Sequence, residues 1–181
     1  MTGPPTGAEA CVGCGGLVPR STGSTHPYMR ASPGCWQVYG EVGVRLHGRG
    51  DGRPARWHHV DAYAVQHPGG AEHDRRQRQS VAVHLITLCL LLEGHRSPPP
   101  TPVRRGSTSR VVLRQLGLAD WPFLEPPHHL GAVTVADVHA ARTPAEQESR
   151  ADAWLESAWT AWSDHHPIVR TWAATTQEAY R

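Results

Sequence analysis

The chain has 181 residues, a formal net charge of +2 and 39% hydrophobic residues. This length fits a single domain and is sufficient to bury a real hydrophobic core. The near-balanced charge does not call for a polyanionic partner, so we expect no nucleic-acid binding.

The N-terminal segment shows no charged stretch followed by an apolar one, as a secretory signal would. The longest apolar stretch, residues 81–92, is interrupted by His84 and Thr87 and is too short to span a bilayer. We therefore expect a cytoplasmic protein without a membrane partner. Cysteines are kept reduced in that compartment, which favours metal or redox chemistry over structural disulfides.

Residues 1–10 are rich in glycine, proline and threonine, and we expect a disordered tail there. Residues 11–35 show no helical or strand period, yet they hold three of the four cysteines. This composition predicts a loop-rich cap that is ordered by a bound metal rather than by a core. We treat residues 11–181 as one domain.

The core helices are expected between residues 36 and 95. Ser32-Pro33 is a typical helix start, with serine as the N-cap and proline at the first helical position. Further helices are predicted at 55–67 and 75–93, and the latter is apolar on nearly all sides, as a central helix would be. The run Arg75-Arg76-Gln77-Arg78 is interpreted as its solvated start.

Residues 96–142 are predicted to form a proline-rich connector with short elements. Within it, residues 97–102 form a stiff segment and residues 109–118 are ambiguous between helix and strand. Thr143-Pro144-Ala145-Glu146 is a capping box that starts a C-terminal helical hairpin over residues 143–181. The tryptophans expected in its core are Trp154, Trp159, Trp162 and Trp172.

Together these patterns predict an all-α fold, a helical bundle-like body that carries a loop-rich, zinc-stabilised N-terminal cap. Two histidine pairs flank prolines in the second half of the chain, His128-His129 and His165-His166. We interpret both pairs as loop or helix-end residues.

Cys11 and Cys14 form a CxxC motif in a glycine-rich turn, and Cys35 follows after 20 intervening residues. This spacing is typical of a zinc site that is closed by two chain segments, so we expect Zn²⁺ as the cofactor. An iron–sulfur cluster, a redox-active pair and free thiols are the alternatives.

The fourth metal ligand is not fixed by the motif, because Cys89 lies inside the apolar helix. His26 is the nearest candidate along the chain, and we take it as the fourth ligand. His67 and His84 are alternatives if the cap folds onto the helices.

A second group of polar residues lies where packing alone would favour leucine and valine. Its members are candidate catalytic residues: Asp61, Tyr63, Gln66, His67 and His84. On a helix, His58 and Asp61 share one face because they are three residues apart. His84 needs a partner in its apolar helix, since an unsatisfied imidazole costs about 1–3 kcal/mol. The alternative is a set of core polar groups that satisfy one another.

Four phrases of the sequence are distinctive. They are CVGCGG (residues 11–16), HPYMRASPGCW (26–36), VDAYAVQHPG (60–69) and SVAVHL (80–85). In these phrases the chain resembles a bacterial family of unknown function, found mainly in actinobacteria, over residues 11–93 and again at 154–166. The resemblance implies motif positions but no roles for them: Cys11, Cys14, His26, Cys35, Asp61, Tyr63, Gln66, His67 and His84.

These observations favour a small metal-dependent enzyme that activates water or polarises a carbonyl of a small-molecule substrate, with Asp61 or His67 as general base. A non-catalytic, zinc-stabilised interaction module and a thiol or redox sensor are the alternatives. A metal with four protein ligands would be structural, whereas a catalytic metal keeps an open position. The reaction and the oligomeric state are left open by the sequence.

Overall fold

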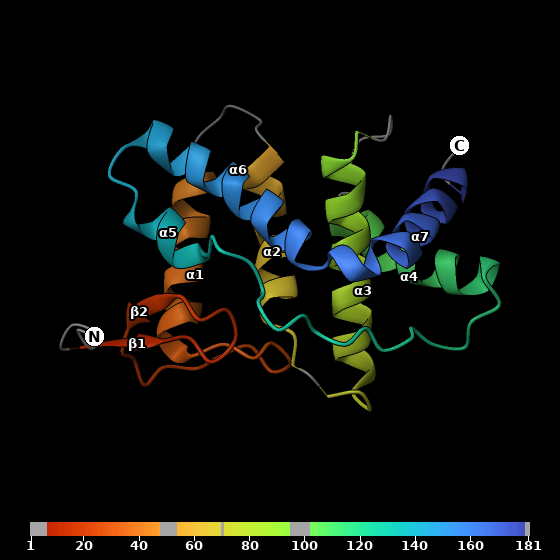
Figure 1. Cartoon of the computed structure of the whole chain (residues 1–181), viewed down its shortest axis with the longest axis horizontal. Coiled ribbons are helices and arrows are strands. Elements are labelled where there is room, and N and C mark those ends of the chain that lie inside the picture. Colours follow the sequence, from red (N-terminus) through yellow and green to blue (C-terminus); the bar gives the residue numbers. More distant parts are fainter. Residues whose placement is uncertain (1–6, 48–53, 70, 95–101, 180–181) are drawn as a thin grey trace.

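The computed structural model describes residues 7–47, 54–69, 71–94 and 102–179. In these ranges the chain forms seven α-helices, a two-stranded sheet and one 3₁₀ turn (Figure 1). The elements are β1 (Ala8–Ala10), β2 (Leu17–Pro19), α1 (Pro33–His47), α2 (Pro54–Gln66), α3 (Arg75–Leu92), α4 (Pro102–Gln115), α5 (Val135–Ala140), α6 (Pro144–Ala161), η1 (Ser163–His165) and α7 (His166–Ala179). The predicted all-α class is confirmed.

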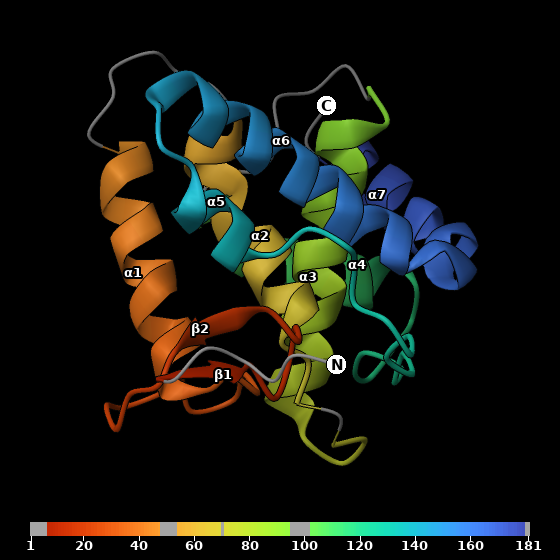
Figure 2. The same cartoon turned by 60° about the vertical axis from the view of Figure 1, so that its left-hand side comes forward.

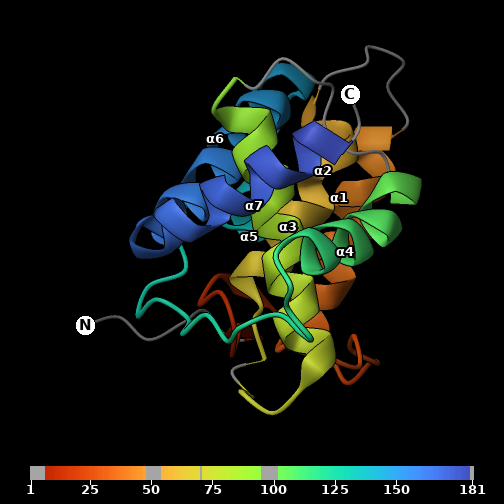
Figure 3. The ribbon, with the colours of Figure 1, turned by 90° about the vertical axis from the view of Figure 1, so that its right-hand side faces the viewer.

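Helix α2 is the centre of the arrangement, because α1, α3 and α6 all pack against it. Helix α6 crosses over α2, and the β1–β2 hairpin lies at the lower end of α1 (Figure 2). On the other side, α4 and α7 pack against α3 (Figure 3). None of the helices in the described ranges is both long and apolar enough to cross a bilayer.

The helix starts follow the local signals in the sequence. Helix α1 begins at Pro33, and the Ser32 hydroxyl accepts a hydrogen bond from the Cys35 N–H at 3.4 Å. The Thr143 side chain caps α6 by accepting from the Glu146 N–H at 3.2 Å. The ambiguous segment 109–118 is helical up to Gln115 as part of α4.

The N-terminal segment differs from the expected tail. Residues 1–6 lie outside the described residues, but Ala8–Ala10 form β1 and pair antiparallel with Leu17–Pro19. The strands are three residues long and bury only Val18 of β2, so no alternating pattern is visible in the sequence. Within the predicted stiff segment, residues 97–101 also lie outside the described residues.

The core is rich in tryptophan, and the four tryptophans predicted to lie in it are buried. Two indole N–H groups bond to the end of α2: Trp154 donates to Gln66 Oε1 at 2.7 Å, and Trp162 donates to the Val65 carbonyl at 3.1 Å. The Gln66 amide also donates to the carbonyls of Leu130 and Val133 at 2.9 and 2.8 Å. Both N–H donors of Gln66 are therefore used to hold the 130–133 loop.

The His165-His166 pair marks the junction between the last two long helices. His165 lies in η1, and its Nε2 donates a hydrogen bond to the Glu125 carbonyl at 2.8 Å. The His166 ring stacks on Trp159 with centroids 3.7 Å apart. The expected helix-end position is confirmed. His128 and His129 lie in the loop before α5.

Replacing Gln66 should destabilise the fold. In Gln66→Leu, the indole of Trp154 and the carbonyls of Leu130 and Val133 lose their partner, and each unsatisfied buried group costs about 1–3 kcal/mol. We expect the free energy of unfolding, measured by urea denaturation, to fall by about 3 kcal/mol or more. The matched control is Gln37→Leu, because Gln37 is exposed and bonds only to Glu41 in the described structure. Equal effects of the two substitutions would contradict this assignment.

Candidate metal centre and adjoining polar pocket

Three cysteines and one histidine meet where the β1–β2 turn, the start of α1 and the end of α2 come together. Cys11, Cys14, Cys35 and His67 each offer a ligand atom, and these atoms all lie within 4.8 Å of one another. Cys11 and Cys14 come from the turn between β1 and β2, Cys35 from the first turn of α1, and His67 directly follows α2. The group, here called the Cys₃His group, therefore joins three separate chain segments.

The turn that carries Cys11 and Cys14 depends on glycine. It closes through hydrogen bonds from the Cys11 N–H to the Gly16 carbonyl (2.9 Å) and from the Gly15 N–H to the Cys11 carbonyl (3.0 Å). Gly15 has a φ of 74°, in the left-handed region that glycine adopts without strain. A Cβ at Gly13 would lie 2.1 Å from the Arg30 carbonyl oxygen, so no larger residue fits there.

The imidazole of His67 is oriented by its own helix. Its Nδ1 lies 2.7 Å from the carbonyl of Tyr63, one turn earlier, and a carbonyl can only accept, so Nδ1 carries the proton. The Nε2 lone pair then faces the sulfur atoms of Cys35 and Cys11 at 3.3 and 3.5 Å. A backbone carbonyl on the far nitrogen is the usual device that orients a metal-ligating histidine.

The distances fit a tetrahedral zinc site. Bond lengths of about 2.3 Å for Zn–S and about 2.05 Å for Zn–N require edges of about 3.8 Å between two sulfurs and about 3.6 Å between sulfur and nitrogen. The Cys14 and Cys35 sulfurs are 3.9 Å apart, and His67 Nε2 lies 3.5 and 3.3 Å from its two sulfurs. Three of the six edges therefore match such a tetrahedron, and the other three are at most 4.8 Å long.

Further donors point at the sulfur atoms. The backbone N–H groups of Gly13 and Ser32 both lie 3.5 Å from Cys11 Sγ, and the Tyr63 hydroxyl lies 3.6 Å from Cys35 Sγ. Donors of this kind stabilise negative charge on a thiolate, which is the form that binds metal. The surroundings of the group therefore suit thiolates.

The electrostatics of the group also favour a cation. Hydrogen bonds from Cys14 and Cys35 strongly lower the pKa of Cys11, while the contacts with Cys11 and Cys14 raise the pKa of Cys35. Burial lowers the pKa of His67, but its contacts with Cys11 and Cys14 outweigh burial and raise the pKa to about 9. Three thiols this close cannot all ionise without a compensating positive charge, which a divalent cation supplies.

His26, the ligand expected from chain proximity, is not part of the Cys₃His group. Its ring packs edge-on against Tyr28 and Trp36, with centroids 4.3 and 5.3 Å away. Burial and the nearby charge of His84 lower the pKa of His26. Among the described residues, His67 takes the fourth position.

The five residues expected to form one polar pocket are divided between three places. His67 joins the Cys₃His group, Tyr63 contacts it through its hydroxyl, and Gln66 holds the 130–133 loop. Asp61 and His84 remain together in a separate cluster between α2 and α3.

This second cluster is built around a fully buried carboxylate. Asp61 is 0% exposed, and its two oxygens lie 2.6 Å from His84 Nδ1 and 2.9 Å from His58 Nδ1. The contact with His58 follows from the spacing of three residues on one helical face. Here, α3 supplies the second imidazole. We call these three residues the His–Asp–His cluster.

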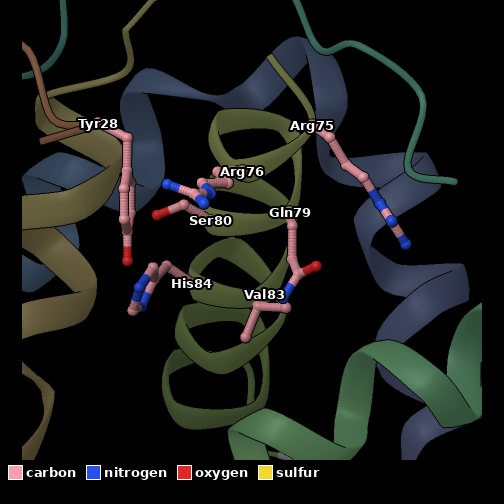
Figure 4. A pocket seen from close by; sticks show the side chains of 7 residues that line it. All are labelled: Tyr28, Arg75, Arg76, Gln79, Ser80, Val83 and His84. Atoms are coloured by element: carbon pink, nitrogen blue, oxygen red, sulfur yellow. The ribbon is translucent and has the colours of Figure 1, made fainter.

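His84 connects the cluster to a surface hollow of about 620 Å³. Its lining residues are Tyr28, Arg75, Arg76, Gln79, Ser80, Val83 and His84 (Figure 4). All except Tyr28 come from the first three turns of α3, and Tyr28 comes from the loop between β2 and α1. Among the described residues, His84 Nε2 has no hydrogen-bond partner, so a ligand in the hollow has access to it. The sequence contained no signal that Tyr28 would line this hollow.

Fold and site together define a helical protein with a candidate Cys₃His metal centre. The chain belongs to DUF5946, a family of unknown function whose sequence profile matches residues 9–163. This confirms the resemblance to a family of unknown function, and the bacterial range stays a prediction. No curated protein and no solved structure shows a significant match to the chain.

Removing one sulfur ligand should remove the metal. We expect Cys11→Ser to lose bound zinc, measured by elemental analysis of the purified protein, and to melt at a lower temperature. A structural zinc contributes on the order of 10 kcal/mol to folding. Cys89→Ala is the matched control, because Cys89 is buried in α3 outside the group. Unchanged zinc content in Cys11→Ser would contradict the site.

The fourth ligand can be tested separately. We expect His67→Ala to lower zinc affinity by several orders of magnitude in a chelator competition, because it removes the nitrogen ligand. His26→Ala should retain the affinity of the original chain, since its ring contacts aromatic side chains instead. The reverse result would restore His26 as the ligand.

Proposed function

We propose that this protein is a zinc-stabilised hydrolase of a small molecule, in which the zinc is structural and His84 is the general base. The observation that carries the proposal is the buried carboxylate of Asp61, which holds the imidazole of His84 at the wall of the hollow. A cytoplasmic location stays a prediction.

The structural role of the metal follows from the number and type of its ligands. Three sulfurs and one imidazole would complete a tetrahedron around one ion, which would leave no position for water or substrate. Sulfur-rich sets favour zinc among the divalent ions that do not change oxidation state. The metal would join the hairpin turn, the start of α1 and the end of α2 into one unit.

The Cys₃His group and the hollow are linked by the loop between β2 and α1. The Arg30 N–H donates to the carbonyl of His67 at 3.1 Å, and the Ser32 N–H points at Cys11 Sγ. Tyr28, two residues before Arg30, lines the hollow opposite α3 (Figure 4). Metal binding would thus hold one wall of the hollow in place.

The role of His84 follows from its hydrogen bonds. Nδ1 donates to the Asp61 carboxylate, which leaves the lone pair of a neutral imidazole on Nε2. Nε2 can accept a proton from a water molecule as that water attacks the carbonyl carbon of an ester or amide. Asp61 then stabilises the imidazolium that forms, as the carboxylate does in a histidine–aspartate pair. The imidazolium gives this proton to the alcohol or amine that leaves as the C–O or C–N bond breaks. Such base catalysis contributes about 10²–10⁴-fold to the rate.

Replacing His84 should strongly reduce turnover without unfolding the chain. We expect the zinc-loaded protein to hydrolyse p-nitrophenyl esters with saturation kinetics, and His84→Gln to reduce kcat by about 100-fold or more. His73→Gln is the matched control, because His73 is exposed and lies just before the same helix. Circular dichroism would verify that both variants retain the helical fold.

Two outcomes would overturn the catalytic part of the proposal. One is turnover of His84→Gln equal to that of the original chain. The other is the absence of turnover by the zinc-loaded protein, which would favour the zinc-stabilised interaction module instead.

Partial exchange of zinc for cadmium should leave kcat within about two-fold, because a metal that is closed by four protein ligands does not touch the substrate.

A further inference from the structure

We infer that the hollow binds a small molecule with an oxyanion group, a phosphate or a carboxylate, and that Arg76 is the residue that holds this group. The inference rests on the proposed function, because it names the substrate class of the same pocket. Its test is binding rather than turnover, so the two can fail separately.

The three arginines at the start of α3 differ in what they contact. Arg75 Nε lies 3.5 Å from an Asp120 oxygen, and the Arg78 guanidinium pairs with the same carboxylate. Arg76 forms no ion pair with any described residue, and its guanidinium points across the hollow toward Tyr28 (Figure 4). Arg75, in contrast, extends away from Tyr28 in the same view.

The nearest carboxylate does not neutralise Arg76 through an ion pair. Asp74 is the N-cap of α3, and its Oδ1 accepts from the backbone N–H groups of Arg76 and Gln77 at 2.9 and 3.4 Å. The cap also occupies these backbone donors. The cationic group that remains available to a ligand is therefore the side chain of Arg76.

Two hydroxyl groups lie beside the guanidinium. Ser80 follows Arg76 by four residues and shares its helical face. Tyr28 faces Ser80 from the loop: in Figure 4 the Ser80 hydroxyl points toward the Tyr28 ring, and the Tyr28 hydroxyl lies at the end of that ring nearer His84. Neither hydroxyl has a hydrogen-bond partner among the described residues. The guanidinium and the two hydroxyls thus line the same hollow.

This donor set matches an oxyanion. A guanidinium presents a planar fork of N–H groups that bonds carboxylate or phosphate oxygens in pairs, and hydroxyls add single donors. His84 Nε2 lies on the same wall, so an anion at Arg76 would place a neighbouring bond of the same molecule beside the base. A hollow of about 620 Å³ has the size of a small-molecule site.

The probes are inorganic phosphate and acetate, titrated separately into the zinc-loaded protein and followed by two-dimensional NMR of the Arg76 side chain and the α3 amides. We expect saturable shifts with at least one anion. Arg76→Gln should weaken binding by about ten-fold or more, because a charge-assisted pair is lost. The matched variant Arg150→Gln removes the same charge from an exposed position of α6 that does not line the hollow, and it should change binding by about two-fold at most.

The outcomes separate the possibilities. Saturation with phosphate alone identifies a substrate that carries a phosphate group, and saturation with acetate alone identifies one that carries a carboxylate. Equal weakening by the two arginine variants would show a general charge effect and overturn the inference, as would the absence of saturation with both anions. If anions bind but His84→Gln keeps full turnover, the catalytic role fails and the anion site stands. If turnover depends on His84 but no anion binds, only the inference made here fails.

Discussion

The contact of three sulfur atoms with one imidazole is the constraint on which the N-terminal part of this molecule depends. Residues 7–32 contain two strands of three residues and a loop without regular structure. Their only buried hydrophobic side chains are Cys11, Val18 and Ala31. Ordering each residue costs about 1–2 kcal/mol of conformational entropy, which so little apolar burial does not offset. A metal in the Cys₃His group would supply on the order of 10 kcal/mol.

Helix α2 connects the Cys₃His group to the His–Asp–His cluster. Asp61 lies in its middle and His67 directly after its end, about 9 Å apart along a helix with a rise of 1.5 Å per residue. The same helix is held by α6 through the indoles of Trp154 and Trp162. The tryptophan-rich core therefore holds the helix that contains the buried carboxylate and is directly followed by His67, the candidate metal ligand.

Local sequence signals were sufficient for the starts of α1 and α6 but not for α4 or for the site. Ser32 and Thr143 predict helix starts because capping acts over three or four residues. The choice between His26 and His67 could not be made this way, because a ligand is selected by how the cap lies on α2, and proximity along the chain does not report that. The pairing of Asp61 with His58 is local and visible in the spacing, whereas its bond to His84 needs the packing of α2 against α3.

A buried aspartate between two histidines can also be a purely structural arrangement, and the two imidazoles show why this account is incomplete. The side chain of His58 is 8% exposed, pairs with the buried carboxylate and does not line the hollow. His84 also gives Nδ1 to Asp61, but its side chain is 14% exposed, and its other edge opens on the hollow beside Arg76. A leucine at this position of an apolar helix would pack without the cost of placing a charge in the core. Of the two histidines in the cluster, only His84 lines the hollow in which a ligand would bind.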